Sequence, residues 1–282
     1  MGGILWLASY PKSGNTWPCG FLANYFRNPE MPFGINNLLR FGFNEASREF
    51  FERVSPRPVS ELDDLEIYHL RPEVHRWIAD KAPDTAFVKT HCALTQIDGF
   101  PTVTLEVTEG AIYIIRNPLD VAASFCSFFN APATEVVAAM ESSTNDLPTS
   151  DQQVHQYLGT WAEHVAGWAD APGMKRLLVR YEDMIRQPFK TFGRGVEFLG
   201  LPEDKARLQK AIRFSGFKVL AAQEREHGFK ERPNSTARFF HKGRVGDWRG
   251  VLSKAQERRI VASQAAVMQR FGYLGADGRL KC

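Results

Sequence analysis

The sequence has few cysteines and no strong excess of charge of either sign. Its 282 residues contain four cysteines, which lie far apart and form no CxxC pair: Cys19, Cys92, Cys126 and Cys282. Small secreted domains need a dense disulfide framework, so this spacing favours a reducing, cytoplasmic compartment. Lys and Arg number 35 against 32 Asp and Glu, a formal charge of +3. We therefore predict that the protein is not a dedicated nucleic-acid binder.

Long apolar runs and metal-ligand motifs are absent as well. No apolar run approaches the roughly 20 residues that a membrane-spanning helix needs. The sequence contains no HExxH motif and no close His/Cys cluster, so we predict that no metal is required. With 44% hydrophobic and 24% charged residues, the composition is that of a globular protein with ample material for a core.

The order of apolar runs predicts alternating strands and helices. Short apolar or β-branched runs predict strands at Ile4 to Tyr10, 86–90, 111–115 and 176–180. Helical spacing predicts helices from Thr16, near Val136, and at 119–129, 153–168, 188–199, 203–214, 217–223 and 253–271. Two short helices are also predicted, one after Ser60 and one at 72–79. This pattern predicts a single doubly wound α/β domain over residues 1–282, with a central parallel sheet, flanking helices and ligands at the carboxyl ends of the strands.

The first predicted strand leads into a glycine loop, Ser9-Tyr-Pro-Lys-Ser-Gly-Asn-Thr-Trp17. A helix N-terminus presents backbone N–H groups to an anion, Gly14 allows close approach, and Lys12 adds positive charge. The lysine precedes the glycine, and no GK[ST] follows, so this is not a Walker loop. The same residues are also compatible with an ordinary turn that carries a surface lysine.

Two further segments have the character of anion sites. Arg116 ends the apolar strand of YIIRNPLDVAAS, and Ser124 lies in the helix that follows. An arginine there can bind an anion or form a structural ion pair with Asp120. The segment FFHKGRVGDW, residues 239–248, combines aromatic rings, glycines and Lys242. It can close over a nucleotide, or form a solvated basic loop held by Trp248.

Together these segments resemble the sulfotransferase superfamily that uses 3'-phosphoadenosine 5'-phosphosulfate. YPKSGNTW is similar to its 5'-phosphosulfate loop, YIIRNPLDVAASF to its 3'-phosphate motif, and FFHKGRVGDW to its closing RKGxxGDW segment. Val88-Lys-Thr-His91 and Val179-Arg-Tyr-Glu-Asp183 resemble the family's KTH and YED elements. These signals run from residue 4 to 248 in the expected order.

The resemblance implies a set of donor-binding residues. Those for the 5'-phosphosulfate are Lys12, Ser13, Gly14, Asn15, Thr16 and Trp17, and those for the 3'-phosphate are Arg116, Ser124, Lys242 and Gly243. Positions near the adenine and ribose are Tyr181, Ser215, Phe217, Phe239 and Phe240. His241 stands where the family usually has arginine, which implies a weaker, pH-dependent phosphate ligand. Lys254 and Arg258 depart from the family's dimer segment, which leaves the oligomeric state open.

The implied reaction is sulfuryl transfer to a hydroxyl or amine. His91 would act as general base, because neutral imidazole can accept a proton near neutral pH, and Lys12 would stabilise the leaving phosphate. Lys89 would assist, or would point into solvent or pair with a carboxylate. The alternatives are a nucleotide-dependent kinase, for which no magnesium ligand set is evident, and a non-catalytic nucleotide-binding protein.

The acceptor pocket is expected to be lined by irregular segments rich in phenylalanine. These segments are 27–59, 125–150 and 224–238. Their aromatic residues favour a small, partly apolar or aromatic acceptor, whereas a sugar or antibiotic scaffold remains an alternative.

Overall fold

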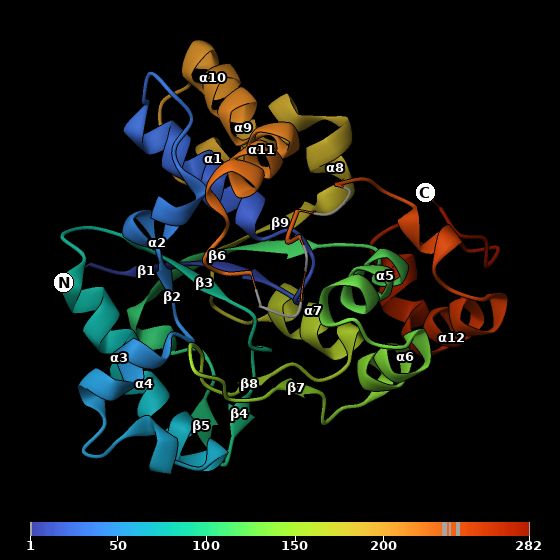
Figure 1. Cartoon of the computed structure of the whole chain (residues 1–282), viewed down its shortest axis with the longest axis horizontal. Helices are drawn as coiled ribbons and strands as arrows, with labels where there is room; N and C mark the ends of the chain where they lie inside the picture. The colour runs from blue at the N-terminus through green and yellow to red at the C-terminus, as the bar shows by residue number, and fades with distance from the viewer. Residues whose placement is uncertain (1, 233–235, 237, 241–242, 282) are drawn as a thin grey trace. The chain divides into compact units, whose positions relative to one another are not determined.

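Short apolar strands form a sheet whose strands end at the polar motifs. The computed structural model describes residues 2–232, 236, 238–240 and 243–281. The main sheet has five strands in the order β2-β3-β1-β6-β9: β2 Phe43–Asn44, β3 Ala86–Thr90, β1 Ile4–Ser9, β6 Thr108–Ile115 and β9 Arg176–Arg180. Both β1 and β2 pair with β3 in parallel (Figure 1). The predicted α/β class with a central parallel sheet is confirmed.

The described chain also contains two small hairpins and a set of α-helices. The hairpins pair β4 Gln96–Ile97 with β5 Phe100–Pro101, and β7 Asp146–Leu147 with β8 Gln156–Tyr157. The helices are α1 Thr16–Arg27, α2 Leu38–Phe41, α3 Arg48–Val54, α4 Asp64–Lys81, α5 Pro118–Phe129, α6 Ala133–Glu141, α7 Trp161–Asp170, α8 Tyr181–Arg186, α9 Pro188–Phe198, α10 Lys205–Ser215, α11 Phe217–His227 and α12 Lys254–Arg270. Within the described ranges, none of these helices has the length and apolar character required to cross a membrane.

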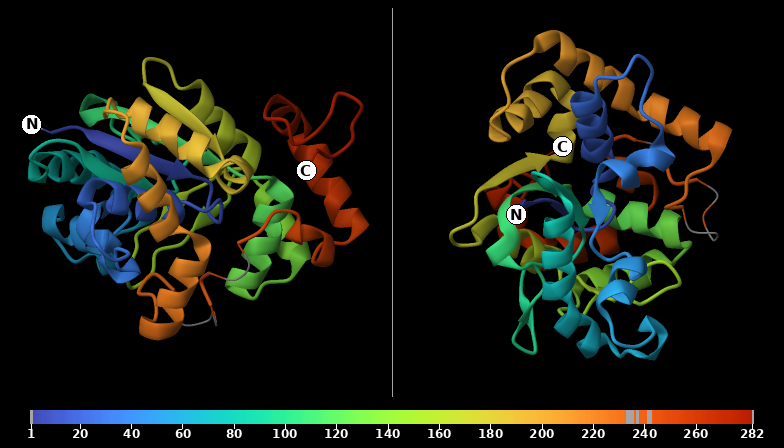
Figure 2. Two further views of the ribbon diagram at one scale, coloured as in Figure 1. Left: turned by 90° about the horizontal axis from the view of Figure 1, so that it is seen from above. Right: turned by 90° about the vertical axis from the view of Figure 1, so that its left-hand side faces the viewer.

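The chain divides into two compact units that alternate along the sequence. The first, here called the sheet unit, comprises residues 1–10, 42–113 and 141–178, and the second, the helical unit, comprises 11–41, 114–140 and 179–282. In the sheet unit, α4 packs against β1. In the helical unit, α1 packs against α10, and α12 packs against α5 (Figure 2). The single-domain organisation stays a prediction.

Two predictions place helix boundaries at the wrong residues. The helix predicted from 153 begins at Trp161, because Thr160 and Glu163 form a capping box and Gly159 has a φ of +63°. The residues before it instead contribute β8. The two short helices predicted after Ser60 and at 72–79 are one helix, α4, which contains Pro72 and is capped by Asp63.

Candidate functional site

The glycine loop connects β1 to α1 through an unusual backbone conformation. Lys12 has a φ of +66° and Gly14 a φ of +92°. The left-handed conformation is costly for a residue with a side chain, and such residues cluster at functional sites. Helix α1 begins two residues after Gly14, and its first turn, which is fully described, carries no acidic residue. The loop therefore places a lysine two residues before a glycine that precedes the positive end of a helix.

Gly14, Tyr181 and Arg116 form a stack beside this loop. A Cβ atom at position 14 would lie 2.6 Å from two ring atoms of Tyr181. The guanidinium carbon of Arg116 lies 4.4 Å from the centroid of the same ring. Burial raises the pKa of Tyr181, so its phenol stays neutral. Only glycine permits this contact between the loop and the ring, and the ring holds Arg116 next to the loop.

Arg116 is buried and only partly satisfied by hydrogen bonds. Its Nη1 donates to the carbonyl of Lys12 at 2.8 Å, which supports the strained loop. Its Nε, the hydroxyl of Ser13 and the indole N–H of Trp17 are buried without a hydrogen-bond partner among the described residues. Buried polar groups are normally paired, so three unpaired donors around one loop fit an anionic ligand that accepts hydrogen bonds.

Asp120, which the sequence offered as an ion-pair partner of Arg116, anchors the backbone of the GDW segment. Its carboxylate accepts N–H bonds from Gly246 at 2.8 Å and from Trp248 at 3.2 Å. Asp120 lies in the first turn of α5, where Asn117 is the N-cap. These bonds tie the closing segment to the helix that follows Arg116. Sequence reasoning missed this role, although an acidic residue in the first turn of a helix is a recognisable signal.

One aromatic ring of the C-terminal motif, that of Phe239, lies near Lys12. Phe239 and Phe240 pack against a buried cluster formed by Ile35, Leu220 and Phe229. The ammonium of Lys12 lies 3.3 Å from the ring centroid of Phe128 and 4.6 Å from that of Phe239. The structure thus brings the first and third motifs together.

Glu224, which the sequence analysis did not single out, fixes the aromatic pair. Its carboxylate is buried and accepts the backbone N–H groups of Phe239 at 2.6 Å and Phe240 at 2.9 Å. It lies on α11, fifteen residues before Phe239. No local pattern links such distant positions, so the sequence alone gave no signal for this tether.

The remaining predicted donor residues are dispersed through the helical unit. Asn15 and Thr16 are buried at the start of α1, and Ser124 is half-buried on α5. Ser215 is fully buried and donates to the carbonyl of Ala211 at 2.8 Å. Gly243 has a φ of +62°, and a Cβ there would lie 2.3 Å from the ring of Phe217. His241 and Lys242 lie outside the described residues.

His91 lies in the sheet unit, directly after β3. Its Nδ1 is 2.9 Å from the carbonyl oxygen of Ser9. A carbonyl only accepts hydrogen bonds, so Nδ1 carries the proton and the lone pair of the neutral ring lies on Nε2. The carbonyl of His91 accepts a bond from Nε2 of His164 at 3.0 Å. Lys89, on β3, is half-buried.

Comparisons with known proteins agree on one family. A family model described as "Sulfotransferase domain" matches residues 4–272. Rat sulfotransferase 1A1 is 25% identical over 94% of this chain and 84% of its own length, and mouse sulfotransferase 1B1 is 25% identical over 92% and 81%.

Solved structures share the fold. Retinol dehydratase in complex with androsterone and the inactive cofactor PAP has a TM-score of 0.64 at 18% identity, covering 99% of this chain and 82% of its own. Mouse sulfotransferase SULT7A1 complexed with PAP has a TM-score of 0.61 at 20% identity, covering 95% and 84%. At these identities the likeness establishes the fold.

Proposed function

The chain belongs to the sulfotransferase family, and from this premise we propose that it transfers a sulfuryl group from 3'-phosphoadenosine 5'-phosphosulfate to a hydroxyl or amine of a small molecule. The donor supplies an activated sulfuryl group and leaves as adenosine 3',5'-bisphosphate. The kinase alternative is not favoured, because the glycine loop lacks the Walker lysine and the magnesium-binding residue that follows it. Among the described residues, no cluster of three or more His, Cys, Asp or Glu side chains is arranged to hold a metal ion.

The observation that carries the proposal is the set of buried unpaired donors around the glycine loop. Ser13 Oγ, Trp17 Nε1 and Arg116 Nε are buried without partners in the part of the chain that the structure describes. An unsatisfied buried donor costs about 1–3 kcal/mol, so the site is suited to a ligand with many acceptor oxygens. The two phosphate groups and the sulfate of the donor match this requirement. In the proposal, Ser13 and Trp17 bind the 5'-phosphosulfate and Arg116 binds the 3'-phosphate.

The chemical step is an in-line displacement at sulfur. The acceptor oxygen or nitrogen forms a bond to sulfur while the bond from sulfur to the phosphate oxygen breaks. The acceptor proton passes to Nε2 of His91, which holds the ring lone pair because Nδ1–H is bound to Ser9. Lys12 stabilises the negative charge that develops on the departing phosphate. Its ammonium lies over the rings of Phe128 and Phe239.

The remaining assignments extend this proposal. The other donor contacts come from Gly14, Asn15, Thr16, Ser124, Tyr181, Ser215, Phe217, Phe239, Phe240, Lys242 and Gly243, within one domain of residues 1–282. The acceptor is partly apolar or aromatic, as the phenylalanines of segments 27–59 and 125–150 indicate. These segments were expected to be irregular, but they contain α2, β2, α3, the end of α5 and α6. A cytoplasmic location rests on the scattered cysteines.

The test is a calorimetric titration that separates the two phosphates of the donor product. Arg116→Ala should weaken binding of adenosine 3',5'-bisphosphate by about 10- to 150-fold, because a hydrogen bond to a charged group contributes about 1.5–3 kcal/mol. Affinity for adenosine 5'-phosphate, which lacks the 3'-phosphate, should change little. Arg194→Ala removes an exposed charge from α9 of the same unit and serves as the control. Equal losses of affinity for the two nucleotides would show that Arg116 stabilises the loop and does not bind the 3'-phosphate.

A further inference from the structure

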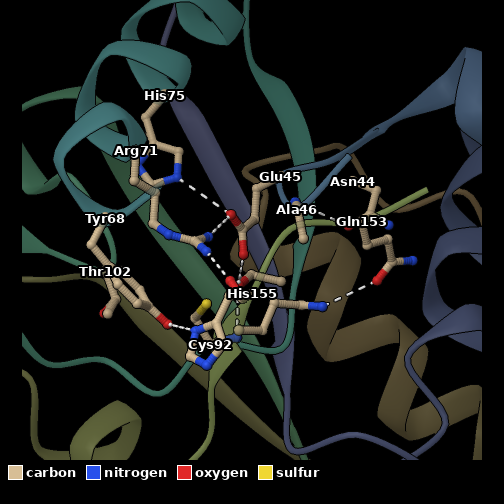
Figure 3. A network of polar contacts seen from close by, with 12 residues as sticks. Asn44, Glu45, Ala46, Tyr68, Arg71, His75, Cys92, Thr102, Gln153 and His155 are labelled. Atoms are coloured by element: carbon tan, nitrogen blue, oxygen red, sulfur yellow. Dashed lines mark hydrogen bonds and ion pairs between the residues drawn. The ribbon is translucent and has the colours of Figure 1, made fainter. Parts of the chain in front are cut away.

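A fully buried ionic network lies beside the strand that ends at His91. Glu45, Arg71 and His75 each have 0% exposure in the sheet unit. Arg71 forms an ion pair with Glu45 and donates a second hydrogen bond to the carbonyl of His155 (Figure 3). His75 lies with Nε2 3.8 Å from the same carboxylate. The guanidinium carbon of Arg71 lies 5.0 Å from the ring centroid of Tyr68.

The network contacts the two residues that precede His91. The backbone N–H of Glu45 donates to the carbonyl of Lys89 at 3.1 Å. The hydroxyl of Thr90 donates to the Glu45 carboxylate at 2.9 Å and accepts the backbone N–H of Cys92 at 3.1 Å. One hydroxyl group therefore connects the buried ion pair to the peptide on the far side of His91.

Other contacts hold His91 itself. Its Nδ1–H donates to the carbonyl of Ser9, Nδ1 also lies 3.3 Å from the Ser9 hydroxyl oxygen, and the His91 carbonyl accepts from His164. The backbone from 90 to 92 carries the imidazole, and the Thr90 hydroxyl bonds both the Glu45 carboxylate and the backbone N–H of Cys92.

The Glu45 carboxylate at the centre of this network is permanently charged. Burial by itself would raise the pKa of Glu45, but the adjacent Arg71 guanidinium, the nearby His75 ring and the hydrogen bond from Thr90 lower it to about 2. The carboxylate is thus ionised at every pH at which the protein would work. Buried ion pairs add little net stability compared with apolar packing, whereas their hydrogen bonds are strongly directional.

We propose that Thr90, held by Glu45 and Arg71, is a positioning residue that orients His91 for proton removal. The proposal rests on the proposed sulfuryl transfer for its kinetic consequence, but the orientation of His91 can be measured without turnover. Thr90 contacts no reacting atom in this account. It acts through the backbone that carries the base.

The kinetic test compares three variants at saturating donor. Thr90→Val removes the hydroxyl and keeps the shape, Thr90→Ser keeps the hydroxyl, and Thr108→Val removes a comparable hydroxyl that bonds Trp6 in the same unit. Because a misplacement of about 1 Å costs up to about 100-fold in rate, Thr90→Val should lower kcat by about 10- to 100-fold with the KM for donor nearly unchanged. Thr90→Ser should recover most of kcat, and Thr108→Val should leave it intact. If Thr90→Val does not fold, Thr90→Ala takes its place.

Nitrogen-15 NMR of the histidines tests the positioning role of Thr90 independently of the proposed function. The His91 signals, assigned by their loss in His91→Gln, should show the Nδ1-protonated ring in the unaltered protein and in Thr108→Val. In Thr90→Val they should show a mixture of tautomers. Unchanged His91 signals and unchanged kcat in Thr90→Val would overturn the positioning role. A protein with no sulfuryl transfer but with the expected NMR change would refute the proposed function and leave the positioning role supported.

Discussion

His164 makes the stability of the protein sensitive to acid because it is buried in its neutral form. Its side chain is fully buried, with Nδ1 accepting from the Tyr113 hydroxyl at 2.8 Å and Nε2 donating to the carbonyl of His91 at 3.0 Å. Burial lowers its pKa from 6.5 to about 4. Between these values the unfolded chain binds a proton that the folded chain does not, so falling pH favours unfolding. One such proton lowers the free energy of unfolding by about 1.4 kcal/mol per pH unit. The total loss of stability from above pH 6.5 to below pH 4 is therefore about 3 kcal/mol.

Urea denaturation followed by tryptophan fluorescence at several pH values measures this loss. His164→Gln keeps an amide N–H able to reach the carbonyl of His91 but cannot titrate. As the pH falls from 6.5 to 4.5, the free energy of unfolding of His164→Gln should decrease less steeply than that of the unaltered protein. The two slopes should differ by about 1.4 kcal/mol per pH unit. Burial lowers the pKa of His75 in the same direction, so the difference between the two proteins isolates His164. Identical pH slopes would show that His164 does not cause the loss of stability in acid.

Two further substitutions test the donor site by calorimetric titration with adenosine 3',5'-bisphosphate. Gly14→Ala should weaken binding at least about tenfold, because the new methyl would overlap the Tyr181 ring. Gly173→Ala introduces similar backbone strain, at a φ of +71° with nothing within 4 Å, and should leave the affinity unchanged. Glu224→Ala should also weaken binding by about tenfold, because it releases the two backbone N–H groups of 239–240. An affinity within twofold of the unaltered protein in either variant would contradict its assigned role.

The sequence predicted the elements whose signals are local. The strand before Pro11, the strand before Arg116 and the helices that follow them were recognisable from apolar runs that end at Gly or Asn-Pro motifs. The start of α7 was missed because aromatic spacing was extended backward past Gly159. The Thr160 and Glu163 capping box was the local signal that marks the true beginning.

Contacts between distant residues could not be predicted in the same way. Glu45 and Arg71 are 26 residues apart, and Glu224 lies 15 residues before its nearer backbone partner. Each is a charged residue that sequence reasoning assigns to the surface by default. Only the folded arrangement shows that these carboxylates are buried and hold the segments that carry His91 and Phe239.

Sulfuryl transfer itself is measured with sulfur-labelled 3'-phosphoadenosine 5'-phosphosulfate and a panel of phenols, alcohols and amines, read by mass spectrometry. We expect a labelled sulfate ester or sulfamate on at least one acceptor without added metal, together with stoichiometric adenosine 3',5'-bisphosphate. His91→Ala should abolish the transfer and retain affinity for that product. Full turnover by His91→Ala would show that His91 is not the base.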